Sequence, residues 1–220
     1  MTTKFYLMLA TAAMATSAAA YAMANTPAGA GTPIAAAVEG AVVANPALAI
    51  QPTDRILGNP MAPHTLIEYA SMTCSHCARF HTEFLPAIQK EYIDTGKLKL
   101  VQRDLPWDNM ALGIAKVARC AEPNQYYTLV GAFFKTQEQW MKTSDPMGEI
   151  KKISRLVGMT PEKTEACIND GPLQEQLLAT KKVALEVLKV QGTPTFYLNG
   201  KQIELTKFED VKAAVDAVAK

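Results

Sequence analysis

The sequence predicts an α/β fold with an inserted helical domain. Residues 64–103 read as strand, helix and strand, a βαβ unit whose two strands should be parallel. Residues 107–189 keep the three- and four-residue apolar spacing of helices, and residues 190–220 return to a hairpin and a last helix. We therefore expect an α/β domain made of residues 52–106 and 190–220, interrupted by a helical domain of residues 107–189.

Residues 1–24 have the pattern of a cleavable secretory signal. Lys4 precedes an apolar run from Phe5 to Ala20, and an Ala-x-Ala cleavage site ends directly before Asn25. The run is too short and too rich in Ala and Thr to span a membrane comfortably, so an uncleaved anchor is the weaker interpretation. The signal predicts export to an oxidising compartment, where disulfides form and persist.

The charge of the chain gives no sign of a nucleic-acid partner. Cleavage of the signal removes Lys4 from the 22 basic residues and none of the 21 acidic ones, so the mature chain is close to neutral. Nucleic-acid-binding domains usually carry a clear excess of basic residues on one face. We therefore expect no nucleic-acid partner.

Residues 25–51 are rich in Ala, Pro and Gly and carry almost no charge. This composition predicts a flexible leader between the signal and the folded part. An alternative is a short helix over residues 34–43 that pairs with its copy in a second chain, although Gly40 and the shortness of the stretch disfavour it. The compact part should begin near Asp54.

The βαβ unit follows from the apolar pattern. Residues 64–70 have the length and apolar weight of a buried strand, and residues 97–103 alternate like a second one. Between them a helix should begin at Ser75. Its apolar residues recur at three and four, and Pro86 should bend it.

Helix-start signals divide the inserted domain. Asp108 and Asn124 can each cap a helix, and Thr160 followed by Pro161 is a strong start signal. The helices are expected over residues 108–121, 124–140, 148–157, 160–169 and 172–189.

The C-terminal part should be a hairpin and a helix. The Asn199-Gly200 pair between residues 195–198 and 201–205 is the strongest local hairpin signal. Residues 208–219 have the apolar spacing of an amphipathic helix.

The chain is organised around Cys74-Ser75-His76-Cys77, two thiols at the start of the first helix. At this position the Cys74 sulfur should lie near unpaired backbone N–H groups and the positive end of the helix dipole, which favour the thiolate. A cysteine so placed titrates at roughly 3.5 to 7.5. His76 is the only residue between the cysteines that can tune them by charge. We expect Cys74 to form mixed disulfides and Cys77, one turn further in, to resolve them.

The order of these elements resembles the thioredoxin superfamily, and residues 68–77, EYASMTCSHC, resemble bacterial DsbA-like thiol:disulfide oxidoreductases. The resemblance implies a thioredoxin fold with an inserted helical domain and a periplasmic protein disulfide oxidase. It further implies a redox-active disulfide in place of a cofactor, reduced exported proteins as substrates, and reoxidation by a membrane partner of the DsbB kind. Pro194 would be the cis-proline facing the reactive disulfide, with Thr193 before it, and together they would bind substrate. We expect a monomer.

Glu68 matches the acidic residue that the family keeps beneath the active site. On the predicted strand it shares a face with Leu66 and Ala70, so it should be at least partly buried. The resemblance implies that it relays protons to Cys77. An equally weighted alternative gives Glu68 a structural partner such as a lysine.

The direction of exchange stays open between two uses of the same fold. Strong oxidases of the family usually carry proline where this chain has Ser75, and a threonine like Thr193 also occurs in isomerase and reductase relatives. A disulfide isomerase or reductase is therefore the alternative to an oxidase.

Cys120 and Cys167 lie in the inserted domain without a two-residue spacing. We expect a structural disulfide between them, since an exported protein tolerates two buried free thiols poorly. A non-enzymatic alternative uses Cys74, Cys77 and His81 as three ligands for zinc or copper, although His81 is as easily a helix-face residue.

Overall fold

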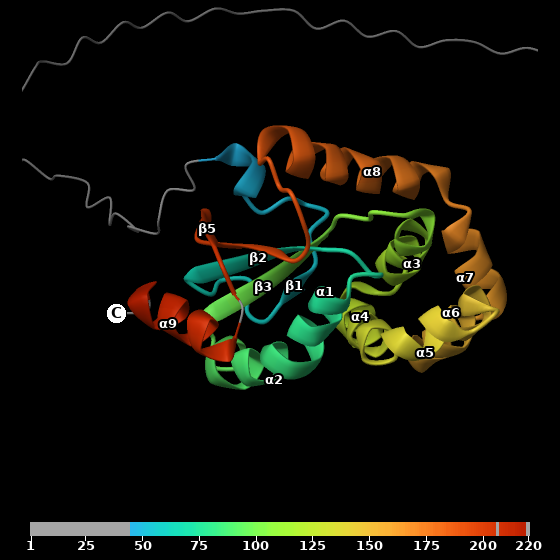
Figure 1. Cartoon of the computed structure of the whole chain (residues 1–220), viewed down its shortest axis with the longest axis horizontal. Helices are drawn as coiled ribbons and strands as arrows, with labels where there is room; N and C mark the ends of the chain where they lie inside the picture. The colour runs from blue at the N-terminus through green and yellow to red at the C-terminus, as the bar shows by residue number, and fades with distance from the viewer. Residues whose placement is uncertain (1–44, 206, 219–220) are drawn as a thin grey trace, which may run out of the picture. The chain divides into compact units, whose positions relative to one another are not determined.

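The computed structural model describes residues 45–205 and 207–218. These residues form a mixed five-stranded sheet in the order β1-β3-β2-β4-β5 (Figure 1). β2 and β3 are parallel, and the other neighbouring strands are antiparallel. The strands are β1 (Ile56–Leu57), β2 (His64–Ala70), β3 (Leu98–Asp104), β4 (Thr195–Leu198) and β5 (Lys201–Ile203).

The α-helices follow the order that the sequence predicts. They are α1 (Ser75–Arg79), α2 (Leu85–Ile88), α3 (Asn109–Arg119), α4 (Tyr126–Lys135), α5 (Gln137–Lys142), α6 (Pro146–Ser154), α7 (Pro161–Ile168), α8 (Gly171–Lys182) and α9 (Phe208–Val218). Short 3-10 turns lie at η1 (Pro46–Leu48), η4 (Pro123–Gln125) and η5 (Arg155–Val157), and π-helical turns at η2 (Phe80–Phe84), η3 (Gln89–Ile93) and η6 (Val183–Val187). Pro86 is the second residue of α2, which follows directly on η2, and this π-helical turn already loosens the hydrogen-bond ladder that a proline interrupts.

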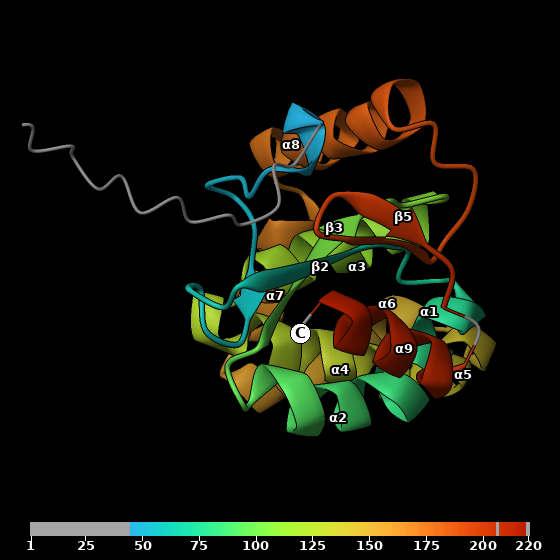
Figure 2. The same ribbon diagram turned by 90° about the vertical axis from the view of Figure 1, so that its left-hand side faces the viewer.

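The sheet is covered on both faces. Figure 2 shows α8 on one side and α2 and α9 on the other. Alternate residues of β2 serve the two sides: Leu66 packs with Ile88 and Val215, whereas Ile67 and Tyr69 pack with Ala184. Burying each such apolar side chain stabilises the fold by roughly 1.5 to 3 kcal/mol.

The helices between β3 and β4 build a core of their own that reaches the cysteine motif. Phe133 and the fully buried Trp140 share this cluster with Met72 and Cys77. Tyr127 on α4 ties the helices to the sheet, because its hydroxyl accepts a hydrogen bond from the backbone N–H of Gln102 at 2.9 Å. The inserted helices therefore pack against the start of α1, the helix that contains Cys77.

The predicted fold class is confirmed: an α/β sheet carries a helical insertion between its third and fourth strands. Two predicted caps are also confirmed, since Asp108 accepts a hydrogen bond from Ala111 N and Thr160 one from Lys163 N. The division into residues 52–106 with 190–220 and 107–189 remains a prediction, and the described residues of both parts belong to one compact unit.

Other predicted boundaries were wrong. Asn124 does not cap a helix but lies inside a 3-10 turn, and the single helix expected over residues 124–140 is two helices that meet at Thr136. The next helix begins earlier than residue 148, at Pro146, because Asp145 caps it by accepting a hydrogen bond from Gly148 N. A two-residue strand, β1, was not predicted.

The leader was expected to run to residue 51, but its described end is packed. Leu48 is buried in the core, and Arg103 donates hydrogen bonds of 2.6 Å to the carbonyls of Ala47 and Ala49. Arg103 also pairs with Asp54 at 2.8 Å. The predicted signal at residues 1–24 and the leader up to residue 44 lie outside the described residues. Within the described part of the chain, no helix is both long and apolar enough to cross a bilayer.

Candidate active site

Cys74 lies where the chain passes from β2 into α1. It is the N-cap residue of α1, with φ −81° and ψ 120°, and its side chain is partly exposed. In this extended conformation an N-cap side chain points back over the first helical turn, toward the unpaired N–H groups of the second and third helical residues. Those residues are His76 and Cys77, so the chain direction aims two backbone donors at the Cys74 sulfur.

The surroundings of Cys74 favour its thiolate. A hydrogen bond with the Cys77 side chain lowers the pKa of Cys74 most, and burial of the sulfur opposes it. The Thr193 side chain and the backbone N–H groups of Cys77 and His76 lower the pKa further, to about 5 from an ordinary 9.0. At neutral pH the reduced protein therefore carries a thiolate at Cys74.

Cys77 has the opposite character. Its side chain is fully buried, and burial raises the pKa of the Cys77 thiol well above 9.0. The hydrogen bond to Cys74 and the charge of Glu68 raise this pKa further. The two sulfurs of one motif are thus a partly exposed thiolate and a buried thiol.

The loop before β4 supplies the wall opposite the cysteines. The Thr193-Pro194 peptide bond is cis, and the Thr193 carbonyl accepts a hydrogen bond of 3.2 Å from Cys74 Sγ. The two residues are 119 positions apart in the sequence. The fold therefore brings both predicted parts of the site into contact.

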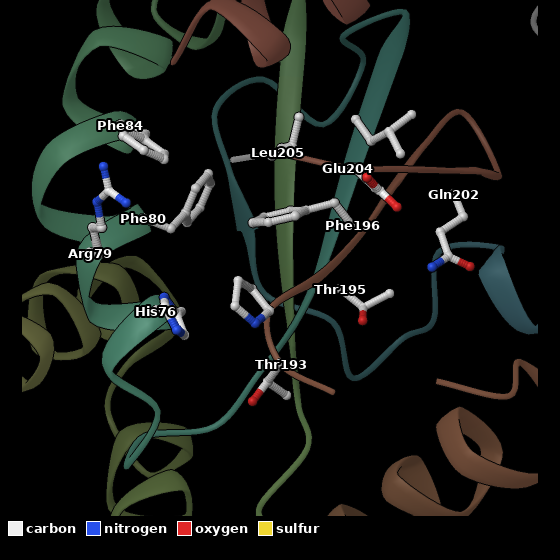
Figure 3. A pocket seen from close by; sticks show the side chains of 12 residues that line it. His76, Arg79, Phe80, Phe84, Thr193, Thr195, Phe196, Gln202, Glu204 and Leu205 are labelled. Carbon is white, nitrogen blue, oxygen red and sulfur yellow. The ribbon is translucent and has the colours of Figure 1, made fainter. Parts of the chain in front are cut away.

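A groove runs beside this junction (Figure 3). It has a volume of about 430 Å³, and its lining combines His76, Phe80, Phe84, Phe196 and Leu205 with the Thr193-Pro194 loop. Figure 3 shows the aromatic side chains of α1, η2 and β4 turned toward one another, with polar side chains around them. The groove is apolar at its centre, and its wall includes Thr193, whose carbonyl contacts the Cys74 sulfur.

Glu68 is fully buried beneath the motif, on the face of β2 that also carries Leu66. One of its carboxylate oxygens lies 2.8 Å from Nε2 of His81, whose side chain is also buried and stacks on Phe134 with ring centroids 4.4 Å apart. The partner of Glu68 is therefore a histidine and not the lysine that the sequence suggested. The other carboxylate oxygen has no hydrogen-bond partner among the described residues.

His81 was also the third ligand of the alternative metal site. Its Nε2 is engaged with Glu68. Among residues 45–205 and 207–218, no three His, Cys, Asp or Glu side chains gather in a group that could hold a metal ion.

Three side chains that support the site were not predicted. Gln137 donates hydrogen bonds to the carbonyls of Met72 and Cys74 at 2.8 and 3.0 Å. Asp108, predicted only as a helix cap, also accepts one from the Thr73 hydroxyl at 2.7 Å. Trp107 donates one to Thr193 Oγ1 at 3.0 Å. No sequence pattern marks them, because each reaches its partner across at least 35 residues.

Cys120 and Cys167 form a disulfide bond between the end of α3 and α7, with Cα atoms 6.2 Å apart. The bridge closes a loop over a sequence separation of 47. In the chain-entropy description, such a loop stabilises the fold by about 4 kcal/mol. Cys74 and Cys77 are the free thiols of the structure.

Comparison with known proteins agrees with this geometry. A family model described as Thioredoxin matches residues 50–217. A Rickettsia typhi protein that carries the provisional name protein-disulfide oxidoreductase is 32% identical over 168 residues, which are 76% of this chain and 62% of that protein. The chain thus spans less than two thirds of the length of this relative. The disulfide bond formation protein D of Bacillus subtilis is 23% identical over 185 residues and 80% of each chain.

Among solved structures, the crystal structure of Wolbachia pipientis alpha-DsbA1 superposes with a TM-score of 0.71 at 29% identity. The superposition covers 78% of this chain and 94% of that one. The family match, the fold and the position of the cysteine pair agree with one another. The chain belongs to the thioredoxin family and is one of its DsbA-like members.

Proposed function

We propose that this protein is a periplasmic thiol:disulfide oxidoreductase that donates the Cys74–Cys77 disulfide to reduced cysteines of exported proteins. The observation that carries the proposal is the position of Cys74 at the start of α1 against the cis Thr193-Pro194 loop, where its surroundings lower its pKa to about 5. A stabilised thiolate lowers the free energy of the reduced pair, so the disulfide becomes a stronger oxidant. The same property makes Cys74 a good leaving group when a substrate disulfide forms.

The transfer proceeds in two exchange steps. A substrate thiolate attacks Sγ of Cys74, a mixed disulfide forms, and the Cys74–Cys77 bond breaks with its electron pair on Cys77. A second substrate thiolate then attacks the substrate sulfur of the mixed disulfide, and Cys74 leaves as the thiolate. The substrate gains one disulfide and loses two electrons and two protons. The electrons reduce the pair, while one proton ends on Cys77 and the other enters solvent.

Glu68 and His81 have a place in the first step. Cys77 leaves as a buried thiolate, which is costly in free energy unless a proton reaches it. The Glu68–His81 pair is the buried proton-carrying group next to it, since the charge of Glu68 acts on Cys77 and Glu68 contacts His81 at 2.8 Å. In this proposal Glu68 relays to Cys77 one of the two protons that the substrate releases, and it relays that proton away from Cys77 on reoxidation.

Substrate binds as an extended chain across the Thr193-Pro194 loop. The groove beside the loop is lined by Phe80, Phe84 and Phe196, which favours apolar residues next to the reacting cysteine. His76 stands at the same edge, where its ring can contact the substrate or the leaving sulfur. Reoxidation falls to a membrane partner of the DsbB kind, and the protein acts as a monomer.

The test is a stoichiometric transfer. Oxidised protein is mixed with a reduced peptide that carries two cysteines, and free thiols on the peptide are counted by mass after alkylation. The proposal predicts loss of both peptide thiols and appearance of two on the protein. As a control, a Cys77→Ala variant can be linked through a mixed disulfide at Cys74 to a peptide that has one cysteine. This mixed disulfide should persist until a second thiol is added.

The alternative isomerase or reductase gives a different result in the same assay. It would leave the reduced peptide unchanged but rearrange or reduce a peptide with mispaired disulfides. Failure of the oxidised protein to oxidise the reduced peptide would overturn the oxidase proposal.

A further inference from the structure

Trp107 is an exposed aromatic residue with a specific polar contact at the redox site. It lies in the loop between β3 and α3, and 44% of its surface is exposed. Its indole Nε1–H donates a hydrogen bond of 3.0 Å to the hydroxyl oxygen of Thr193, 86 residues away. An exposed tryptophan that makes one directed hydrogen bond to the residue in contact with the reactive sulfur is unlike an ordinary core residue.

The contact restricts what the Thr193 hydroxyl can do. An indole N–H is only a donor, so the hydroxyl oxygen accepts from Trp107 and its own hydrogen remains for another acceptor. The Thr193 carbonyl accepts from Cys74 Sγ at 3.2 Å, so this residue lies directly against the sulfur. When Cys74 ionises it can no longer donate to the carbonyl, and the thiolate instead needs donors.

The loop that carries Trp107 is fastened on two sides. Lys181 on α8 donates to the carbonyl of Pro106 at 2.7 Å, and its ammonium lies 5.6 Å from the centre of the Trp107 ring. On the other side Asp108 accepts from the hydroxyl of Thr73, the residue before Cys74, at 2.7 Å. One short loop therefore contacts the chain before the reactive cysteine and, through Trp107, the residue before the cis-proline.

We propose that Trp107 is a positioning residue of the redox site: its indole N–H holds the Thr193 hydroxyl so that the hydroxyl donates to the Cys74 thiolate. This inference rests on the proposed exchange chemistry at Cys74. Trp107 itself does not touch the reacting sulfur in this scheme. The Thr193 hydroxyl so held is a second side-chain donor beside the Cys77 thiol, in addition to the two backbone donors that the helix start provides.

The first experiment is a pair of matched variants in the full chain. Trp107→Phe keeps an aromatic ring for Lys181 and removes the indole N–H, while Thr193→Val removes the hydroxyl and keeps the branched shape. The titratable and charged groups around the site, His76 and Cys77 on α1, Asp108 in the loop and Lys181 on α8, stay unchanged in both. The Cys74 thiolate is followed by its absorbance near 240 nm as pH is varied.

Trp107→Phe should raise the pKa of Cys74 by roughly one half to one pH unit, the size of one ordinary hydrogen bond. In a Thr193→Val background the same substitution should change nothing, since the hydroxyl on which it acts is gone. An unchanged titration in Trp107→Phe would overturn the proposal. An equal rise in the Thr193→Val background would also overturn it, because the indole would then act by another route.

A second measurement needs no substitution of Trp107. The chain has two tryptophans, and the buried Trp140, whose indole donates to the Phe133 carbonyl at 2.8 Å, is the internal control. In the reduced protein the indole N–H resonance of Trp107 should shift with the Cys74 titration near pH 5, and that of Trp140 should not. This shift should be absent in Cys74→Ser.

A Trp107 resonance that does not respond to Cys74 would contradict the positioning role even if the variants fold poorly. Neither measurement uses a substrate or a redox partner. A protein that failed to oxidise peptides could still pass both, so failure of the proposed function and failure of this inference are distinguishable.

Discussion

Reduction of the active-site pair should add to the stability of the protein a pH-dependent contribution that the oxidised protein lacks. In the folded reduced protein the pKa of Cys74 is about 5, against an ordinary 9.0. Because the folded-state value is the lower one, the unfolded chain binds more protons between these two values. The thiolate therefore stabilises the fold increasingly from pH 5 up to pH 9, and the contribution is lost as the pH falls through 5. In the disulfide neither sulfur titrates.

The magnitude follows from the distance between the working pH and the folded-state pKa. At pH 7 the reduced fold would gain about 2.7 kcal/mol from two pH units at 1.36 kcal/mol each. Cys74 is partly exposed, so solvent screening reduces the expected gain to about 1 to 1.5 kcal/mol. The Cys77 thiol has a raised pKa, stays protonated in this range and adds no dependence.

The assay is urea unfolding of the oxidised and the reduced protein at several pH values between 4 and 7. The quantity to follow is the change with pH of the difference between their unfolding free energies. The chain constraint of the disulfide does not vary with pH, and the carboxylates are common to both forms, so both contributions largely cancel. The difference should shift by about 1 to 1.5 kcal/mol in favour of the reduced form from pH 4 to pH 7. Reduced Cys74→Ser should lack this shift. A constant difference, or one that shifts in favour of the oxidised form, would refute the assignment of a thiolate to Cys74.

Three further predictions address the supports of the site. Cys77→Ala should raise the pKa of Cys74 by about one pH unit after screening, because it removes the largest stabilising hydrogen bond. Cys77→Ser keeps a donor and should raise this pKa less, and absorbance titration of the thiolate compares the two variants. Replacing both Cys120 and Cys167 by alanine should lower the unfolding free energy in urea by about 4 kcal/mol and leave the pKa of Cys74 unchanged. A loss of the low Cys74 pKa in this variant would contradict the separation of the bridge from the active site. Arg103→Met should cost roughly 3 to 5 kcal/mol in urea unfolding, because it removes the only cation in the described part of the chain that pairs with the buried Asp54 carboxylate, and a donor to each of two carbonyls. Wild-type stability would show that these contacts of the packed leader end contribute nothing.

The parts of the site that could be predicted are those carried by neighbours in the sequence. The cysteine spacing, the strand before it and the helix start place Cys74 at an N-cap, a position that favours a low pKa. The resemblance to DsbA-like proteins adds Thr193 and Pro194, which the structure places against Cys74. The disulfide between Cys120 and Cys167 could be expected from the compartment, although no sequence feature gives its geometry.

What could not be predicted depends on contacts between distant elements. His81 meets Glu68 only because the helix after the motif packs on the buried face of β2. The sequence suggested a structural partner only in general terms, with a lysine as the example. No motif surrounds Trp107, and its hydrogen bond to Thr193 joins two loops that are 86 positions apart in the sequence. β1 is two residues long, too short to show any periodicity, and pairs with β3 after the chain has folded back.

The low pKa of Cys74 was predicted partly from the charge of His76, but in the structure other groups lower this pKa more. The strongest contribution is the hydrogen bond with Cys77, and the His76 contribution that can be named is its backbone N–H. The imidazole lies at the edge of the groove, where it is placed to contact a bound chain. The helix start and the partner sulfur explain most of the thiolate stabilisation.

The most direct test of the account is the reduction potential of the Cys74–Cys77 pair, measured by equilibrating the protein with mixtures of reduced and oxidised glutathione. A thiolate stabilised as described here should place the potential well above the roughly −270 mV of thioredoxin, in the range from about −180 to −120 mV where disulfide-donating members of the fold lie. The Cys120–Cys167 bridge should remain closed throughout, which alkylation and mass measurement can verify. A potential at or below that of thioredoxin would contradict the account, because the pair would then be a reductant.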